Sequence, residues 1–125
     1  MSESQDKILG DLGEKEAVRF LKDKGYKILQ RNFRTRLGEI DIIAQDRDTL
    51  CFIEVKTRIS HQYGSPLESI TSSKQRKIAL LALSYLKAKK IFDAKMRFDV
   101  ITIDKQKPVN GGITLLQDAF RVDSF

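Results

Sequence analysis

The sequence contains few of the residues that covalent cross-links and transition-metal sites require. Its 125 residues include one cysteine, one histidine, two prolines and no tryptophan. Cys51, as the single cysteine, cannot form an intrachain disulfide or a cysteine-based zinc site. With His61 as the single histidine, most transition-metal sites are excluded as well. There is no apolar run of the ~18–20 residues that cross a bilayer, and Met1 to Lys7 lack the hydrophobic stretch of a secretory signal. We therefore expect a cytoplasmic protein with no membrane partner.

The composition predicts one folded domain over residues 1–125. Hydrophobic residues make up 41% of the chain and charged residues 32%, which is enough apolar material for one core and too much for a disordered tail. A chain of this length leaves little room for a second domain. We find no internal repeat, linker or low-complexity tract in it.

The positive charge is concentrated in the C-terminal part of the sequence. Residues 1–70 hold 12 Lys/Arg and 12 Asp/Glu, whereas residues 71–125 hold 11 and 5, which supplies the whole net charge of +6. Such a field favours a polyanionic partner, most often nucleic acid. A solvated basic face kept for solubility is the alternative. Attachment to anionic lipid through Lys87, Lys89 and Lys90 is disfavoured, because no strongly apolar face accompanies them.

The order of the apolar patterns predicts an α/β domain with a mixed sheet. Helices are expected over 6–24, ending at Gly25, and from Ser72 or Ser73 as the cap to about Lys89. Five β-rich segments are expected to be strands: 26–33, 40–45, 50–56, 97–103 and 113–120. Polar segments are expected to connect them: 34–38, 46–49, 57–71 and 107–112. In the first strand, Ile28 is expected on one face and Arg31 on the other.

The hairpin of 40–45 and 50–56 places two acids opposite each other. A loop at 46–49 sets Gln45 against Leu50, and counting outward sets Asp41 against Glu54. Directly opposed side chains have Cβ atoms only ~4.5–5.5 Å apart, so two carboxylates there repel unless a positive charge lies between them. The other face is expected to be core, because it carries apolar residues: Ile40, Ile42, Cys51, Ile53 and Val55.

Lys56 adds an ammonium group, since it lies two residues beyond Glu54 on the same face of the strand. Mg²⁺ suits such a site because it takes one or two carboxylates and gains further ligands from water and phosphate. A bound metal stabilises charge on a phosphate and lowers the pKa of its water, and a lysine can orient that water or offset charge in the transition state. The alternative is an ordinary surface ladder in which Lys56 merely balances two acids.

Glu14 is a candidate third acid. It lies on the helical stripe of Ala17 and Leu21, at the border of the buried face, where a carboxylate is costly unless it is paired or metal-bound. Gly10 and Gly13 on the same helix allow close approach of the sheet or of a nucleic-acid backbone, or else mark a fraying helix start.

Other charged residues are expected to have supporting roles. Glu39 shares the face of Asp41, and hydrogen bonding is expected of it more than metal ligation. Arg97 and Asp99 share a face of their strand and are expected to form an ion pair. Three basic residues near the acids are the expected nucleic-acid contacts: Arg58, Lys74 and Lys77.

The chain resembles the YraN family of small bacterial proteins in motifs that run from Gly10 to Ile103. The motifs are GDLGE from Gly10, RNF from Arg31, GEID from Gly38, FIEVKTR from Phe52 and RFDV from Arg97. That family is similar to archaeal Holliday junction resolvases and belongs to the restriction-endonuclease-like superfamily of metal-dependent nucleases. Together, the GEID and EVKTR motifs are specific, whereas either alone is weak.

The resemblance implies a restriction-endonuclease-like αβββαβ core, with a central mixed β-sheet flanked by helices and the site on the central hairpin. It implies that Asp41 and Glu54 bind metal, that Lys56 is the catalytic lysine, and that Glu14 is the additional helix carboxylate. The implied activity is a Mg²⁺- or Mn²⁺-dependent endonuclease on DNA, including branched or junction DNA, and the implied assembly is a homodimer. Because the superfamily also contains inactive members, the alternative is a nucleic-acid-binding or adaptor protein that keeps the fold.

Overall fold

The computed structural model describes residues 3–58, 70–106 and 109–122, and the side chains of 10–57, 70–106 and 111–122. Most of the predicted 57–71 loop, including His61, lies outside the described residues. The elements follow the order α1 (Glu3–Asp23), β1 (Lys27–Thr35), β2 (Gly38–Asp46), β3 (Thr49–Arg58), α2 (Ser72–Ala88), β4 (Lys95–Asp104), the 3₁₀ helix η2 (Val109–Gly112) and β5 (Ile113–Leu116). The predicted αβββαβ order is confirmed.

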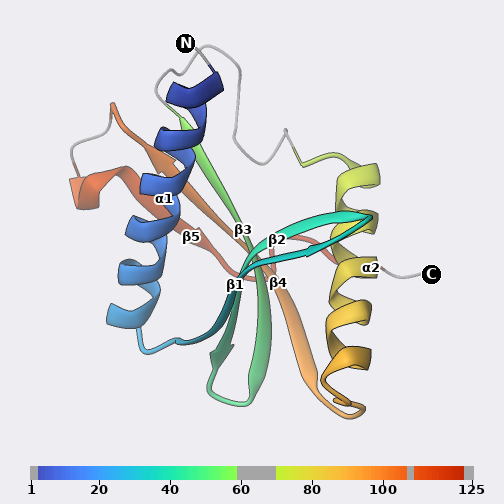
Figure 1. The fold of residues 1–125 in the computed structure, drawn as a ribbon. Helices are drawn as coiled ribbons and strands as arrows, with labels where there is room; N and C mark the ends of the chain where they lie inside the picture. Colours follow the sequence, from blue (N-terminus) through green and yellow to red (C-terminus); the bar gives the residue numbers. More distant parts are fainter. Residues whose placement is uncertain (1–2, 59–69, 107–108, 123–125) are drawn as a thin grey trace.

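The strands form one mixed sheet in the order β1-β2-β3-β4-β5. Strands β3 and β4 are parallel and are connected through α2, while the other neighbours are antiparallel. Helices α1 and α2 lie on opposite sides of the sheet (Figure 1). The predicted α/β class with a mixed sheet flanked by helices is therefore confirmed.

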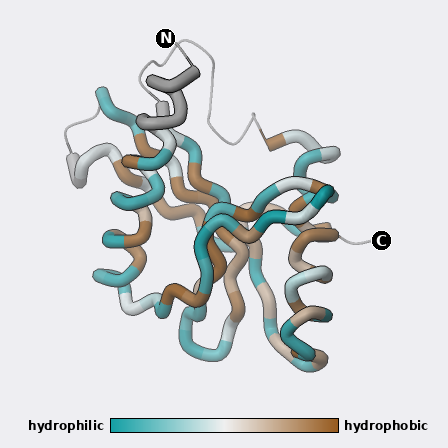
Figure 2. Tube along the Cα trace, in the orientation of Figure 1, coloured by the Kyte–Doolittle hydropathy of each residue, from teal (hydrophilic) through white to brown (hydrophobic). Residues whose placement is uncertain are grey.

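Each helix covers its own hydrophobic core, so both faces of the β2–β3 hairpin are buried. Under α1, Ile42 packs with Ile53, and under α2, Ile43 packs with Phe52. Figure 2 shows hydrophobic residues along the central strands and hydrophilic residues at the turn between β2 and β3. The expectation that this hairpin buries only one face is wrong, because α2 covers the second face. Ile40 is buried as expected, although it belongs to the α2 core.

The register of the β2–β3 hairpin agrees with the prediction from the turn to the pair Ile42–Ile53, whereas the expected pair Asp41–Glu54 lies beyond the last paired residues. Gln45 is paired with Leu50, and the pairing continues to Asp46 and Thr49. The turn itself therefore comprises Arg47 and Asp48, with Arg47 in the left-handed region at φ 57°. The turn between β1 and β2 is likewise shorter than predicted, since the strands extend to Thr35 and from Gly38.

Strand β1 contains an irregularity that changes which side chains face α1. The register shifts between Ile28 and Gln30, so a bulge lies at Leu29. As a result Arg31 is paired with Ile42, just as Ile28 is paired with Ala44. Both partners belong to the core under α1. The prediction that Ile28 and Arg31 occupy opposite faces is wrong, because the extra residue reverses the alternation.

The helices approach the sheet through specific contacts. A Cβ on Gly13 would lie 2.2 Å from Thr57 Oγ1, whereas a Cβ on Gly10 would meet no atom within 4 Å. Gly13 thus permits close approach of α1 to β3.

The cap of α2 is Thr71, whose Oγ1 accepts from the backbone N–H of Lys74 at 3.2 Å, rather than Ser72 or Ser73. Neither described α-helix has the apolar length that a membrane span requires.

Candidate metal centre

Asp41 lies where β2 and β3 separate. The paired residues of the two strands end at Ile42 and Ile53, and beyond them the backbone N–H of Val55 donates to Asp41 Oδ2 at 2.8 Å. Burial, followed by the negative charge of Glu54, raises the pKa of Asp41 from 3.8 to about 8. Asp41 and Glu54 are therefore close enough to repel each other, at the end of the hairpin.

Three carboxylates from two elements converge at this end of the hairpin. One oxygen each from Glu14 on α1 and from Glu39 and Asp41 on β2 lies within 4.8 Å of the others. The Glu14 side chain is only 14% exposed, and burial is the main reason that its pKa is raised. Glu54 is not a member of this group, although its charge acts on Asp41. The group thus contains two of the three acids expected to bind metal, Glu14 and Asp41, with Glu39 in the place expected for Glu54.

Strand β1 places positive and hydrogen-bonding groups against two of these carboxylates. Arg31 Nη2 lies 3.6 Å from Glu14 Oε2, and Arg34 Nε donates to Glu39 Oε2 at 2.9 Å. Between the arginines, the Asn32 amide nitrogen donates to Glu39 Oε1 at 2.5 Å and to the two oxygens of Glu14 at 3.0 and 3.1 Å. This amide orientation is assigned from the hydrogen-bond network. Glu39 has the predicted hydrogen-bonding role and also contributes an oxygen to the group of three.

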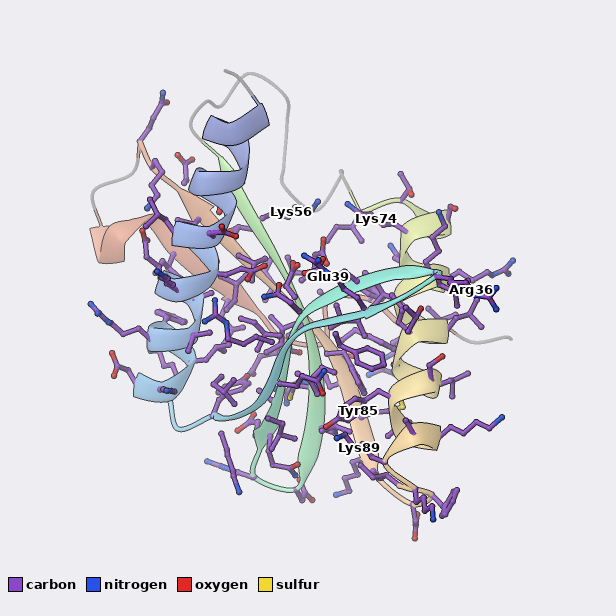
Figure 3. All side chains as sticks on the ribbon, in the orientation of Figure 1. Arg36, Glu39, Lys56, Lys74, Tyr85 and Lys89 are labelled. Carbon is purple, nitrogen blue, oxygen red and sulfur yellow. The ribbon has the colours of Figure 1, made fainter. Side chains whose placement is uncertain are left out.

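A pair of lysines flanks Glu54. Lys56 Nζ on β3 and Lys74 Nζ on α2 lie 3.6 Å and 3.8 Å from the same oxygen, Glu54 Oε1. In Figure 3 the two lysines extend toward one another from their separate elements. The adjacent amine of Lys56 is the main reason that the pKa of Lys74 is lowered, and burial lowers it further. Lys74, predicted as a nucleic-acid contact, is thus part of the lysine–carboxylate cluster.

The other expected nucleic-acid contacts have different positions. Lys77, one turn after Lys74 on α2, is exposed. Arg58 ends β3, and its side chain is outside the described part of the chain.

The chain is similar to known proteins over most of its length. The model of "Uncharacterised protein family UPF0102" matches residues 13–103. The protein belongs to this family. A UPF0102 protein of Chlorobium phaeobacteroides is 55% identical over 84% of this chain and 83% of its own. A UPF0102 protein of Desulfosudis oleivorans is 48% identical over 94% of this chain and 93% of its own. One of Syntrophus aciditrophicus is 43% identical over 95% of this chain and 93% of its own. UPF0102 is the YraN family, so the predicted membership is confirmed.

The residues of this UPF0102 protein fit a hard divalent cation. The donor set consists of carboxylate oxygens, which Mg²⁺ and Mn²⁺ prefer. Glu14, Glu39 and Glu54 each have a cationic partner within 4 Å, whereas Asp41 has none among the described residues. Burial is the main reason that the pKa of Asp41 is raised, and the negative charge of Glu54 raises it further. A cation bound between Asp41 and its neighbours would relieve the repulsion.

A separate polar network lies near the β2–β3 turn of the UPF0102 fold. The Arg97 guanidinium donates to both oxygens of the fully buried Asp99 at 2.8 and 2.9 Å and to Asp46 at 3.0 Å. The Tyr26 hydroxyl accepts from Arg97 at 2.9 Å and from Gln117 at 2.8 Å. The predicted Arg97–Asp99 ion pair is therefore present.

Sequence reasoning assigned no role to Asn32, Arg31 or Arg34, which contact the acids. The available signal was an asparagine within a strand pattern, with Arg31 before it and Arg34 two residues after it, since asparagine tolerates the left-handed backbone that breaks a strand. The missing information was the bulge at Leu29, which turns Arg31 toward α1.

Proposed function

We propose that the protein is a divalent-metal-dependent endonuclease that hydrolyses phosphodiester bonds in DNA. The supporting observation is the convergence of Glu14, Glu39 and Asp41 beside the Lys56–Glu54–Lys74 cluster. Carboxylates crowded together beside ammonium groups suit a cation and a phosphate together. The resemblance of the EVKTR and GEID motifs to metal-dependent nucleases supports the same reading.

The acids of the centre would hold Mg²⁺ or Mn²⁺ through Asp41 and Glu54, with Glu14 as a further ligand. Glu39 is close enough to complete the set. A metal bound there supplies charge stabilisation on the phosphate and a more acidic water.

Lys56 positions the attacking water and offsets negative charge on the reacting phosphate. Its ammonium is only partly exposed and stays 3.6 Å from Glu54, so its position relative to the acids is defined. Lys74 adjoins it from α2 and would contact the phosphate next to the reaction centre. Lys77 and Arg58 would hold phosphates farther along the DNA.

The test is cleavage of labelled duplex, single-stranded, flap and four-way DNA by the purified protein with Mg²⁺ or Mn²⁺. We expect cleavage of at least one form, most of all the branched ones, and its loss in Glu54→Ala and Lys56→Ala. Lys95→Ala is the matched control, because Lys95 is an exposed lysine whose salt bridge is to Asp48. Cleavage that persists in both site variants would contradict the proposal.

The alternative of an inactive binding or adaptor protein predicts salt-sensitive DNA binding without a metal requirement. Calorimetric titration with Mn²⁺ separates the two: heat of binding that disappears in Glu54→Ala supports the enzyme. Undiminished DNA binding by Asp41→Asn, with no cleavage and no Mn²⁺ binding by the natural protein, supports the adaptor. A homodimer, which would present two sites to the two strands of a junction, belongs to the same proposal and is measured by light scattering.

A further inference from the structure

Asn32 occupies an unusual place on strand β1. Its φ is 55°, a left-handed conformation in the middle of a nine-residue strand. It lies between Arg31, which is paired with Ile42, and Phe33, which is paired with Ile40. In a regular strand, adjacent side chains point to opposite faces. Here Arg31 and Asn32 both reach Glu14, so the left-handed residue breaks the alternation.

The contacts of Asn32 join three elements. Its amide nitrogen carries two hydrogens, and its oxygen neighbours are Glu14 on α1, at 3.0 and 3.1 Å, and Glu39 on β2, at 2.5 Å. The two carboxylates repel each other, as the effect of Glu39 on the pKa of Glu14 records. Arg31 and Arg34 already lie against these two carboxylates, and the side-chain amide bridges them without adding further positive charge.

We propose that Asn32 is a positioning residue of the metal centre: its amide holds the carboxylates of Glu14 and Glu39 side by side, so that both face a cation at Asp41. The inference rests on the proposed function, since it concerns how that site is assembled. Asn32 acts through the two acids and is not itself a catalytic residue.

Asparagine meets the two requirements of this position, a left-handed backbone and an uncharged hydrogen-bond donor. Asparagine is among the few residues that adopt a left-handed backbone at low cost, and its short side chain ends in an NH₂ group. Aspartate tolerates the backbone but has no donor and would add a further negative charge. Alanine has neither property. Glycine retains the backbone conformation and removes only the amide, so it is the cleanest substitution.

The test is calorimetric titration of Mn²⁺ into the natural protein and Asn32→Gly at one fixed pH. We expect Asn32→Gly to bind Mn²⁺ about 10–100-fold more weakly, the usual cost of removing a partner that orients a metal ligand. The matched control is Lys90→Gly. Lys90 is also left-handed, at φ 57°, and is exposed just after α2, so this variant makes the same backbone change away from the acids. We expect the natural affinity for Lys90→Gly.

A double-mutant cycle distinguishes positioning from general support of the fold. In a Glu39→Gln background one of the two repelling charges is gone, so Asn32→Gly should then weaken Mn²⁺ binding by less than about threefold. A structural role alone predicts the same fold-loss in both backgrounds. Thermal melting in EDTA checks that each variant is folded. If Asn32→Gly does not fold, Asn32→Ser, which keeps one hydroxyl donor, replaces it and should show a smaller but measurable loss.

The outcomes separate this inference from the proposed function. Absence of Mn²⁺ binding by the natural protein would overturn the metal centre itself. Normal Mn²⁺ affinity in folded Asn32→Gly, or an equal loss in the Glu39→Gln background, would overturn the role of Asn32 and leave the metal centre intact. Weaker binding that depends on Glu39 supports both.

Discussion

At Asp41, burial and the charges of Glu54, Glu14 and Glu39 all act against ionisation, and only the hydrogen bond from Val55 N–H favours it. A carboxyl whose pKa rises from 3.8 to about 8 holds its proton in the metal-free protein at neutral pH. Metal binding must displace that proton, because a cation binds the carboxylate. In the proposed metal centre, Asp41 would therefore couple metal binding to pH.

The first prediction concerns the pH dependence of the metal-free protein. The pKa of Asp41 is higher in the folded than in the unfolded chain, so its contribution to stability is present below about pH 4 and is lost as the pH rises through about 8. We expect the melting temperature in EDTA to fall between about pH 5 and 9, and this fall to be smaller in Asp41→Asn.

The control for this pH measurement is Asp48→Asn. Asp48 is exposed and its pKa is lowered by Lys95, so this variant should melt with the natural pH dependence in that range. Below about pH 8, Mn²⁺ affinity of the natural protein should rise about tenfold per pH unit, since one proton is released. An Asp41→Asn curve that still follows the natural one would contradict the assignment to Asp41.

The second prediction concerns the two helix glycines. In Gly13→Ala the new methyl group would collide with Thr57 Oγ1, so we expect a loss of about 1–3 kcal/mol in the free energy of unfolding. Gly10→Ala meets open space and should gain about 0.5–1 kcal/mol from helix propensity. Urea unfolding measures both, and Thr57→Ala should partly restore Gly13→Ala. Equal effects of the two alanines would show that α1 does not approach β3 at Gly13.

At the scale of the elements, the polar network around Arg97 connects β4 with the end of β2 and with the segments before β1 and after β5. Arg97 and Asp99 lie on β4, Asp46 ends β2, and Tyr26 precedes β1. The backbone N–H of Asp118, after β5, also donates to Asp99 at 2.9 Å. The favourable interactions with these acids raise the pKa of Arg97 further above its already high value, so the guanidinium stays charged.

The third prediction is that Arg97→Met lowers the free energy of unfolding by about 3–5 kcal/mol, because it leaves the buried Asp99 without its cation. The double variant Arg97→Met/Asp99→Asn should recover part of that loss, since it removes the unpaired charge. Lys95→Met, an exposed substitution on the same strand, serves as the reference. Urea unfolding of Arg97→Met that matches this reference would refute a stabilising role for the network.

For the whole molecule, folding pairs part of the positive charge of residues 71–125 with acids of residues 1–70. Among the described residues, four basic side chains of the C-terminal part are paired with acids of the N-terminal part: Lys74 with Glu54, Lys95 with Asp48, Arg97 with Asp46 and Lys105 with Glu16. Lys89 lies over the ring of Tyr85 near the end of α2, with a distance of 5.9 Å to the ring centroid. The basic charge next to the acids of the metal centre therefore comes from a few described residues on three elements: Arg31 and Arg34 on β1, Lys56 on β3 and Lys74 on α2.

The fourth prediction uses this distribution and rests on the proposed function. DNA affinity should fall about 10–100-fold between 50 and 200 mM salt, as expected for two to three phosphate contacts. Lys77→Ala should reduce the slope of log affinity against log salt by about 1 and leave cleavage at saturating DNA unchanged. Lys74→Ala should reduce the slope similarly and also slow cleavage, because Lys74 adjoins Lys56 and Glu54.

Lys89→Ala is the control for the salt measurements, since Lys89 lies at the other end of α2. Its salt slope and cleavage should equal those of the natural protein. Equal cleavage rates of Lys74→Ala and Lys77→Ala at saturating DNA would show that Lys74 acts only as a distant phosphate contact.

The sequence by itself determined the order of the elements and the register of the central hairpin. Both depend on local chemistry: apolar periodicity selects helix or strand, and the polar turn after Asp46 fixes which residues are paired. For the same reason the motifs around Asp41, Glu54 and Lys56 could be placed on neighbouring strands in advance.

Only the tertiary structure decided which other groups meet at those acids. Glu14 comes from α1, Lys74 from α2, and Asn32 from a strand whose bulge and left-handed residue reverse the expected faces. Contacts between elements depend on sheet twist, on the bulge and on how each helix docks, and residue spacing within one segment carries none of that information.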